Sequence, residues 1–203
     1  MKLMLKVLAV GCFCFISEYS LAQSVGIGIK GGPNFAKLSG SQSLSQNYNN
    51  RTGYHFGAYV LFKLGKIGIQ PELLYSKQGS NFSVNTSNFE ANFDYINIPI
   101  LFKLYTIGGV NLQIGPQLGF ASGGQLKQTI NNVTTSQGYS QVIKNNDLSL
   151  AMGLGWDLPF GLSIDARYNL GLSNNNNISG TSGEIKNQVI MASVGYRLFK
   201  LGK

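Results

Sequence analysis

Residues 147–173 carry one pattern twice, on the two sides of a short turn. Before the turn at residues 159–161, the even positions from 148 to 158 are all apolar, while Ser, Ala, Gly and Asp occupy the odd positions. After the turn, the even positions from 162 to 172 are again apolar, and the odd positions are polar, charged or Gly. Because successive side chains of a β-strand point to opposite faces, this alternation predicts an antiparallel hairpin with one apolar face.

The two strands of this hairpin are long enough to cross a membrane. A typical strand has about 5–6 residues, and these have about twice that number, while about 9–11 residues let a tilted strand span hydrocarbon. Only 12% of the residues are charged, about half the fraction in an average globular domain. The pattern therefore favours a barrel of the outer membrane type, with lipid outside and a narrow interior lined by Gly and polar groups.

The same alternation recurs along the chain and predicts eight strands. We expect them at about residues 24–38, 53–64, 67–79, 93–105, 110–121, 148–158, 162–172 and 187–200. Their connections alternate long and short, which in outer membrane barrels places short turns in the periplasm and long loops outside. The predicted fold is all-β, an eight-stranded antiparallel up-and-down transmembrane β-barrel with short periplasmic turns and long extracellular loops. Residues 122–146 show no sustained pattern and are interpreted as the longest loop.

Aromatic residues are expected to form girdles at the two ends of the outer wall. The predicted members are Phe62, Phe102, Tyr105, Trp156, Phe160, Tyr196 and Phe199 near the short turns, and Tyr54, Phe56, Tyr75, Phe120 and Tyr168 near the long loops. Pro71, Pro99 and Pro116 fall inside predicted strands. Because proline cannot donate to the ladder, each is expected to mark a bulge or a rim position.

The interior of an eight-stranded barrel is just wide enough for side chains to fill it. Glu72 and Asp165 are predicted to face Lys30, Arg167 and Arg197 there, in an internal ion-pair network. We expect this network to plug the lumen, because water channels usually need wider barrels.

The N-terminal residues predict export. A basic start, an apolar run over residues 7–16 and a small-x-small site at residues 20–22 are typical of a secretory signal peptide. We interpret residues 1–22 as that signal peptide and residues 23–203 as one outer membrane β-barrel domain. Both cysteines lie within the predicted signal peptide, so the mature chain is expected to contain neither a disulfide nor a thiolate site.

The predicted mature chain is basic, with 14 basic and 7 acidic residues, a net charge of +7. It contains no basic run or basic helix of the kind that binds nucleic acid, so no nucleic-acid partner is expected. Lys63, Lys66, Lys103 and Lys200 fall near predicted strand ends and short turns. There they favour contact with anionic lipid head groups or simply contribute to solubility, and outer membrane lipids are the expected partner.

No motif in the sequence predicts chemistry. The G-x-G-x-x-G string at residues 26–31 lies within a predicted strand, and no helix follows to bind a pyrophosphate, so it is not interpreted as a dinucleotide site. The single histidine, His55, is predicted to lie at the barrel rim without a chemical role. No spacing of His, Asp, Glu or Cys indicates a metal site. We therefore expect no catalytic residue, no cofactor and no metal ligand.

Five strand motifs resemble those of the PorT-like outer membrane β-barrel family. They are QPELLYS at residues 70–76, YINIP at 95–99, GPQLG at 115–119, RYNLGL at 167–172 and VGYR at 194–197, and the similarity spans about residues 23–200. The resemblance implies an eight-stranded barrel in the outer membrane of a Gram-negative cell. The founding member of that family is associated with a secretion and gliding apparatus, and no catalytic residues carry over.

The sequence thus predicts a monomeric, non-enzymatic outer membrane protein that acts through its extracellular loops. Its role would be structural, adhesive or interactive, or accessory to a secretion complex, with residues 122–146 as the main contact surface. One alternative is a soluble periplasmic lipocalin-like barrel, which would need an apolar interior for a small ligand and a polar exterior. Another is a membrane-embedded lipid-modifying enzyme, which would have to use His55.

Overall fold

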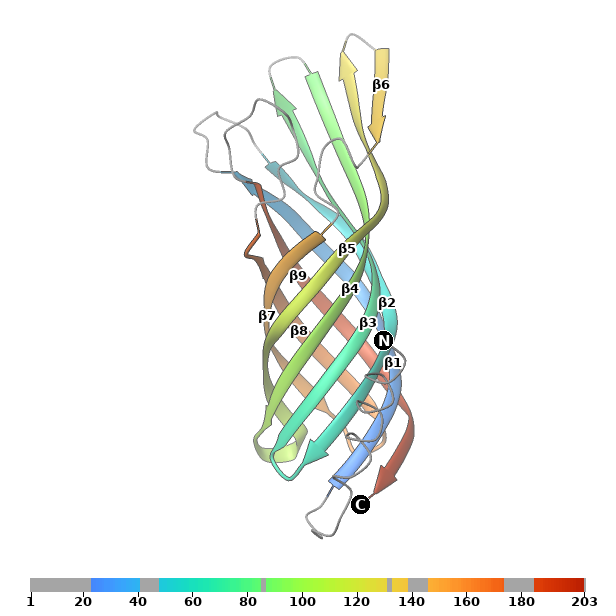
Figure 1. The fold of residues 1–203 in the computed structure, drawn as a ribbon, viewed down its shortest axis with the longest axis vertical. Coiled ribbons are helices and arrows are strands. Elements are labelled where there is room, and N and C mark those ends of the chain that lie inside the picture. The colour runs from blue at the N-terminus through green and yellow to red at the C-terminus, as the bar shows by residue number, and fades with distance from the viewer. Residues whose placement is uncertain are drawn as a thin grey trace, which may run out of the picture.

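Antiparallel strand pairs run around the whole molecule in the computed structural model (Figure 1). The structure describes residues 23–40, 48–84, 87–130, 133–138, 146–173 and 185–202. Its strands are β1 (Gln23–Gly40), β2 (Tyr48–Leu64), β3 (Ile67–Val84), β4 (Ser87–Tyr105), β5 (Val110–Ile130), β6 (Val133–Gly138), β7 (Asn146–Asp157), β8 (Leu162–Gly171) and β9 (Ile185–Gly202), with a single 3-10 turn, η1 (Ile107–Gly109), before β5.

The strand order is β4-β3-β2-β1-β9-β8-β7-β5, and an additional pairing of β4 with β5 closes the ring. β6 pairs with β5 and, among the described strands, with no other, so eight strands form the closed wall. The predicted eight-stranded antiparallel barrel is therefore confirmed. No helix among the described residues is long and apolar enough to cross a membrane. The predicted signal peptide, residues 1–22, lies outside the described residues.

Burial follows the alternation of the sequence. Ile114 and Leu154 are 51% and 57% exposed, because their side chains point away from the barrel axis. Lys30 and Glu72 are 5% and 3% exposed, because theirs point into the lumen. The predicted orientation, apolar groups outside and polar groups inside, is confirmed along the described strands. The outer wall is consequently the reverse of a water-soluble surface.

Short turns join β2 to β3, β4 to β5 and β7 to β8, and they lie at the lower end of Figure 1 together with the outer ends of β1 and β9. Gly65 and Gly161 sit in two of these turns with φ values of 58° and 96°. Such left-handed backbone is readily accessible only to glycine. These two glycines therefore allow the chain to reverse direction within a few residues.

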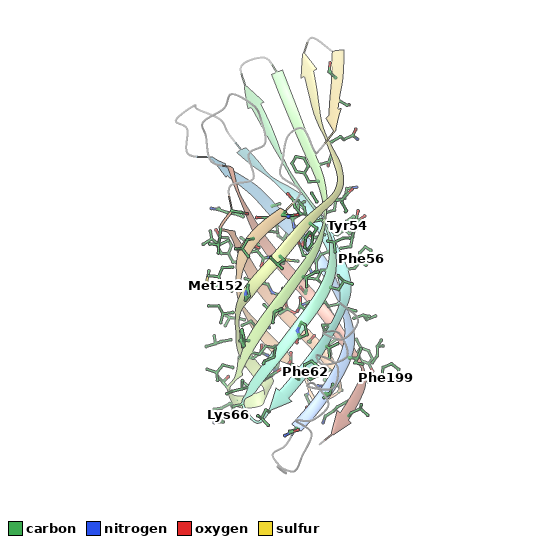
Figure 2. All side chains as sticks on the ribbon, in the orientation of Figure 1. Tyr54, Phe56, Phe62, Lys66, Met152 and Phe199 are labelled. Carbon is green, nitrogen blue, oxygen red and sulfur yellow. The ribbon has the colours of Figure 1, made fainter. Side chains whose placement is uncertain are left out.

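Aromatic side chains gather at both ends of the outer wall (Figure 2). Figure 2 shows the exposed Phe62 and Phe199 toward the short turns and Tyr54 and Phe56 nearer the other end. By their places in the strands, the exposed Phe102, Trp156, Phe160 and Tyr196 also lie toward the short turns, and Phe35 and Phe120 toward the other end. Tyr105 was predicted to join the outer girdle, and this prediction is wrong, since only 4% of Tyr105 is exposed. Tyr105 occupies an odd position of β4, and the odd positions of that strand from 93 to 105 are buried.

The strands extend further than predicted at the end opposite the short turns. Residues 80–92 and 122–146 were interpreted as loops, yet residues 80–84, 87–92 and 122–130 continue strands β3, β4 and β5. Residues 133–138 add the short strand β6. The alternation of apolar and polar side chains stops where the strands leave hydrocarbon, because neither face there contacts lipid. Hydrophobic periodicity therefore underestimates these strands.

The three strand prolines produce no bulges and lie within the ladders and not at the rim, contrary to the prediction. The register on each side of Pro71, Pro99 and Pro116 is unchanged, and only the ladder pairs beside each proline are missing on one side. Register shifts occur elsewhere, for example at Leu198, where Ile27 pairs with Phe199 and the next residue of β1 pairs with Arg197. Proline thus removes local hydrogen bonds without changing which faces its neighbours occupy.

Candidate functional site

Four charged side chains from three strands meet in the middle of the lumen. Arg167 of β8 donates from Nη1 and Nη2 to the two carboxylate oxygens of Glu72 on β3, at 2.9 and 3.0 Å. Lys30 of β1 donates from Nζ to Asp165 Oδ2 at 2.8 Å and to Glu72 Oε1 at 3.3 Å. We call these four residues the charge quartet. Its two positive and two negative charges balance, and the bidentate Arg–carboxylate geometry is the strongest form of such a pair.

The sequence predicted all four members of the charge quartet but also a fifth, Arg197. Arg197 makes no ion pair among the described residues and is only half-buried. It lies near the short turns, where its backbone N–H donates to the carbonyl oxygen of Gly161. Membership of Arg197 in the network is therefore wrong. The bulge at Leu198 beside it shifts the register with β1 at this level.

A second polar cluster closes the end of the lumen beside the short turns. Lys103 Nζ lies 3.0 Å from Asp157 Oδ2, and the hydroxyl of Tyr105 donates to the same oxygen at 2.7 Å. The ammonium of Lys63 lies 3.9 Å from the centroid of the Tyr105 ring. Gln70 joins this cluster to the charge quartet, because it accepts from Lys103 at 3.1 Å and donates to Glu72 at 2.7 Å.

Sequence reasoning missed this second cluster. It interpreted Lys103 as a head-group contact because of its position near a strand end. The available signal was the parity of the positions: Lys103 falls on the inward face of β4, and Asp157 falls on the inward face of β7. Their residue separation of 54 shows why the contact itself depends on closure of the barrel.

His55 lies inside the barrel and not at its rim, which corrects the prediction. It is 1% exposed, with Nδ1 2.6 Å from Asn34 Oδ1 and Nε2 2.8 Å from Ser193 Oγ. Asn34 Nδ2 donates to Ser76 Oγ at 2.8 Å, so Asn34 presents its oxygen to the ring. This network assigns the proton to Nδ1 and leaves Nε2 to accept from the Ser193 hydroxyl.

Ser193, His55 and Asn34 therefore have the order of a nucleophile, a base and an orienting group. Acyl transfer also needs room for a substrate carbonyl beside the hydroxyl and donors for its oxyanion. Ser193 and His55 are 3% and 1% exposed, so surrounding side chains occupy that room. In the described part of the chain there is also no group of three His, Cys, Asp or Glu side chains that could hold a metal ion. The arrangement packs the lumen with hydrogen-bonded polar side chains.

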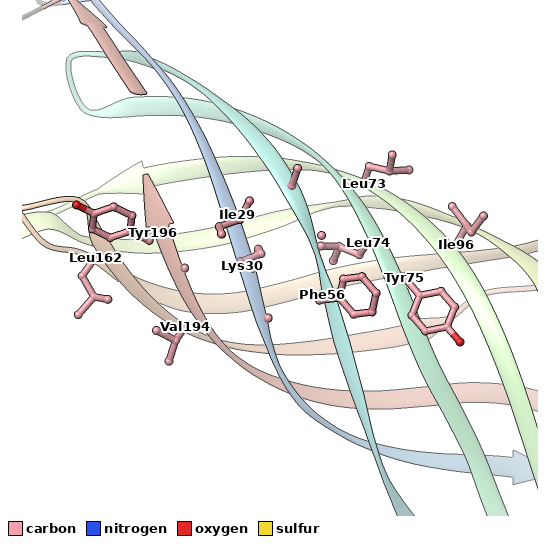
Figure 3. A pocket seen from close by; sticks show the side chains of 14 residues that line it. Ile29, Lys30, Phe56, Leu73, Leu74, Tyr75, Ile96, Leu162, Val194 and Tyr196 are labelled. Carbon is pink, nitrogen blue, oxygen red and sulfur yellow. The ribbon is translucent and has the colours of Figure 1, made fainter. Parts of the chain in front are cut away.

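The outer wall contains an apolar hollow of about 790 Å³ (Figure 3). Ile29, Phe56, Leu73 and Val194 line the hollow with side chains that point away from the barrel axis, and Gly31 contributes no side chain. A lipocalin-like carrier would need such an apolar cavity inside the barrel. Here the apolar groups lie outside and the charge quartet lies inside. The structure therefore lacks the apolar interior and polar exterior that a lipocalin-like carrier requires.

Part of the sheet continues past the barrel wall. β7 begins at Asn146, which pairs with Phe120, so beyond Phe120 strand β5 loses β7 as its neighbour. From Gln125 to Ile130 it pairs with β6 instead, while β3 and β4 remain paired up to Val84 and Ser87. We call residues 79–84, 87–92, 121–130 and 133–138 the projecting sheet. Figure 1 shows it at the end opposite the short turns.

The closed eight-stranded wall, its apolar exterior and its charged interior define an outer membrane β-barrel protein. The chain belongs to the family of the outer membrane protein beta-barrel domain, whose profile matches residues 21–177. It resides in the outer membrane. The comparison with curated proteins finds no match.

Two solved structures show the same fold. Neisserial surface protein A (NspA) is 12% identical, with a TM-score of 0.53 over 86% of this chain and 99% of that chain. Ail, the attachment invasion locus protein of Yersinia pestis, is 16% identical, with a TM-score of 0.53 over 88% of this chain and 99% of that one. Another structure of Ail, in complex with the heparin analogue sucrose octasulfate, matches with a TM-score of 0.52 and the same identity. At such identities the likeness concerns the fold.

Proposed function

We propose that this protein is a non-enzymatic outer membrane barrel that contacts external partners through its projecting sheet. The observation that carries the proposal is the continuation of β3, β4, β5 and β6 beyond the level at which β7 begins. Strands outside hydrocarbon need no lipid-facing residues, so their side chains are available for recognition on a rigid scaffold. The predicted contact surface, residues 122–146, overlaps this sheet, although residues 131–132 and 139–145 lie outside the described residues.

The lumen supports the same proposal. The charge quartet and the cluster around Asp157 fill the interior with paired side chains, which favours an anchoring role over transport. The structure of Ail with a heparin analogue provides a precedent, in that protein, for binding by a barrel of this fold. For the present chain we propose contact with an extracellular partner.

The orientation of the projecting sheet can be tested with single cysteines, because the predicted mature chain has none. Ser136→Cys lies in β6 at an exposed position, and Lys66→Cys lies in an exposed short turn at the other end. We expect a membrane-impermeant maleimide to label the Ser136 variant on intact cells and to label the Lys66 variant only after lysis. Labelling of the Lys66 variant alone on intact cells would indicate the opposite orientation, with the short turns outside the cell.

The interaction role predicts a second result. Deletion of residues 125–138 removes β6 and its β5 partner but leaves every β5–β7 pair in place. We expect the shortened barrel to fold and reach the membrane, while envelope or host-surface partners crosslinked through Ser122→Cys, an exposed position present in both proteins, are lost. The measurement is crosslinking on cells followed by mass spectrometry. A wild-type barrel that yields no crosslinked partner under any condition would contradict the interaction role.

The finer assignment to the PorT-like family, and an accessory role in a secretion complex, are proposals that rest on the strand motifs alone. We further propose that residues 1–22 are removed on export and that the mature protein is a monomer. The family match begins at residue 21, next to the proposed cleavage site, which supports the first of these. N-terminal sequencing of the purified protein and its copurification with secretion proteins would test them.

A further inference from the structure

A small polar chamber of about 10 Å³ lies in the lumen. Its lining comes from six strands and consists of Gln78, Asn97, Gln117, Asp147, Ser149, Asn169 and Val189. Several of these are direct neighbours: Gln117 pairs with Ser149 across β5 and β7, and Asn169 pairs with Val189 across β8 and β9. The chamber therefore lies within one transverse layer of lumen side chains and is not a depression on the outer surface.

Three polar atoms on this layer have no hydrogen-bond partner in the part of the chain that the structure describes. They are Asn97 Nδ2, Gln117 Oε1 and Asn169 Oδ1. Their residues are 1%, 5% and 1% exposed, so bulk solvent does not reach them. A buried polar group without a partner is costly, and three around one chamber call for a common explanation.

The orientation of the amides follows from their other contacts. Gln117 donates from Nε2 to Ser149 Oγ at 3.1 Å, and Asn169 donates from Nδ2 to Met191 Sδ at 2.9 Å, which leaves the oxygen of each amide without a partner. Asn97 places Oδ1 beside Gly119, where an added Cβ would lie 2.9 Å from that oxygen. The unpartnered atoms of the lining are thus one donor, Asn97 Nδ2, and two acceptors, beside the side chains of Gln78, Asp147 and Ser149.

One water molecule matches this set in number, size and polarity. A site needs about 10–15 Å³ of probe-occupied volume and two to four polar partners to hold a water, and a chamber of about 10 Å³ has room for one. The water would accept from Asn97 and donate to Gln117 and Asn169. We propose that this chamber is a specific binding site for a single structural water that links β4, β5 and β8 and completes the closure of the lumen.

The test is a crystal structure of the detergent-extracted protein at a resolution that shows ordered water, with a second crystal soaked in Rb⁺. We expect one density peak at about 2.7–3.2 Å from all three atoms, with no anomalous signal after the soak. An anomalous peak would overturn the proposal in favour of a monovalent cation, with the Asn97 amide reversed to present oxygen. The absence of any peak would overturn it outright.

Substitution gives an independent readout. Gln117→Met keeps the length of the side chain but removes one acceptor, and we expect the peak to weaken or vanish in its crystals. The control is Gln125→Met, an exposed position of the same strand, which should leave the peak at full height. An unchanged peak in the Gln117 variant would contradict the three-point site. If that variant fails to fold, the wild-type soak still decides the question.

Discussion

Replacement of Arg167 by Met is expected to destabilise the folded barrel by about 3–5 kcal/mol, the usual result of removing one partner from a buried ion pair. Glu72 has a side-chain exposure of 0% and receives both guanidinium nitrogens of Arg167. Without Arg167, the charge quartet would contain two carboxylates and one ammonium in a space that water does not reach. The measurement is reversible urea unfolding in lipid vesicles, followed by Trp156 fluorescence.

A double variant separates the loss of charge balance from the loss of packing. Glu72→Gln combined with Arg167→Met leaves Lys30 and Asp165 as a balanced pair, which lie 2.8 Å apart. We expect the double variant to recover most of the lost stability, because replacing both members of a buried pair is often nearly neutral. Arg197→Met, outside the quartet, should have a small effect. A double variant no more stable than Arg167→Met would show that packing, and not charge, explains the loss.

Replacement of Ile114 by Arg is expected to cost about 2–4 kcal/mol, because a cation on the lipid face is most unfavourable at the bilayer midplane. Ile114 is 51% exposed on the outer wall and lies midway along the outward-facing run of β5 between Val110 and Phe120. In water, an exposed apolar residue tolerates such a change with little effect. The substitution therefore tests whether hydrocarbon surrounds this wall.

Val110 provides the matched control on the same strand and the same face. It is 43% exposed but begins β5 beside the short turn, where the cost of Arg falls to about 0–1 kcal/mol. We expect Val110→Arg to insert and unfold almost as the wild type does, with the difference from Ile114→Arg measured by urea titration in vesicles. Equal and negligible costs at both positions would indicate a water-soluble barrel.

The barrel and its orientation could be predicted because hydrocarbon imposes a simple rule on every second residue. The run from Leu148 to Trp156 shows that rule so strictly that the face of each residue follows from its parity. The same alternation, applied within each strand, places Lys30, Glu72, Asp165 and Arg167 inside. In a barrel of this width, inward charges have few neighbours to choose from, which is why the charge quartet was predictable before any distance was known.

The features that the sequence did not predict depend on the register between neighbouring strands or lie in strand segments that do not contact lipid. Lys103 and Asp157 meet because of the register between strands, which periodicity along one strand does not contain. Arg197 lies outside the quartet because it is level with Gly28 and the turn residue Gly161, nearer the short turns than Lys30. The projecting sheet was interpreted as loop because strands in water need no alternation. His55 contacts Asn34 and Ser193, which lie 21 and 138 residues away in sequence, so these contacts depend on the pairing of strands.

The pairing of β1 with β9 makes the two ends of the described wall depend on each other. The first strand of the wall is sealed by the last one, from Ser24 opposite Gly202 to Gly40 opposite Ile185. Without β9, the edges of β1 and β8 would expose peptide N–H and C=O groups that acyl chains cannot satisfy. A truncated polypeptide that ends at β8 would therefore lack a closed wall.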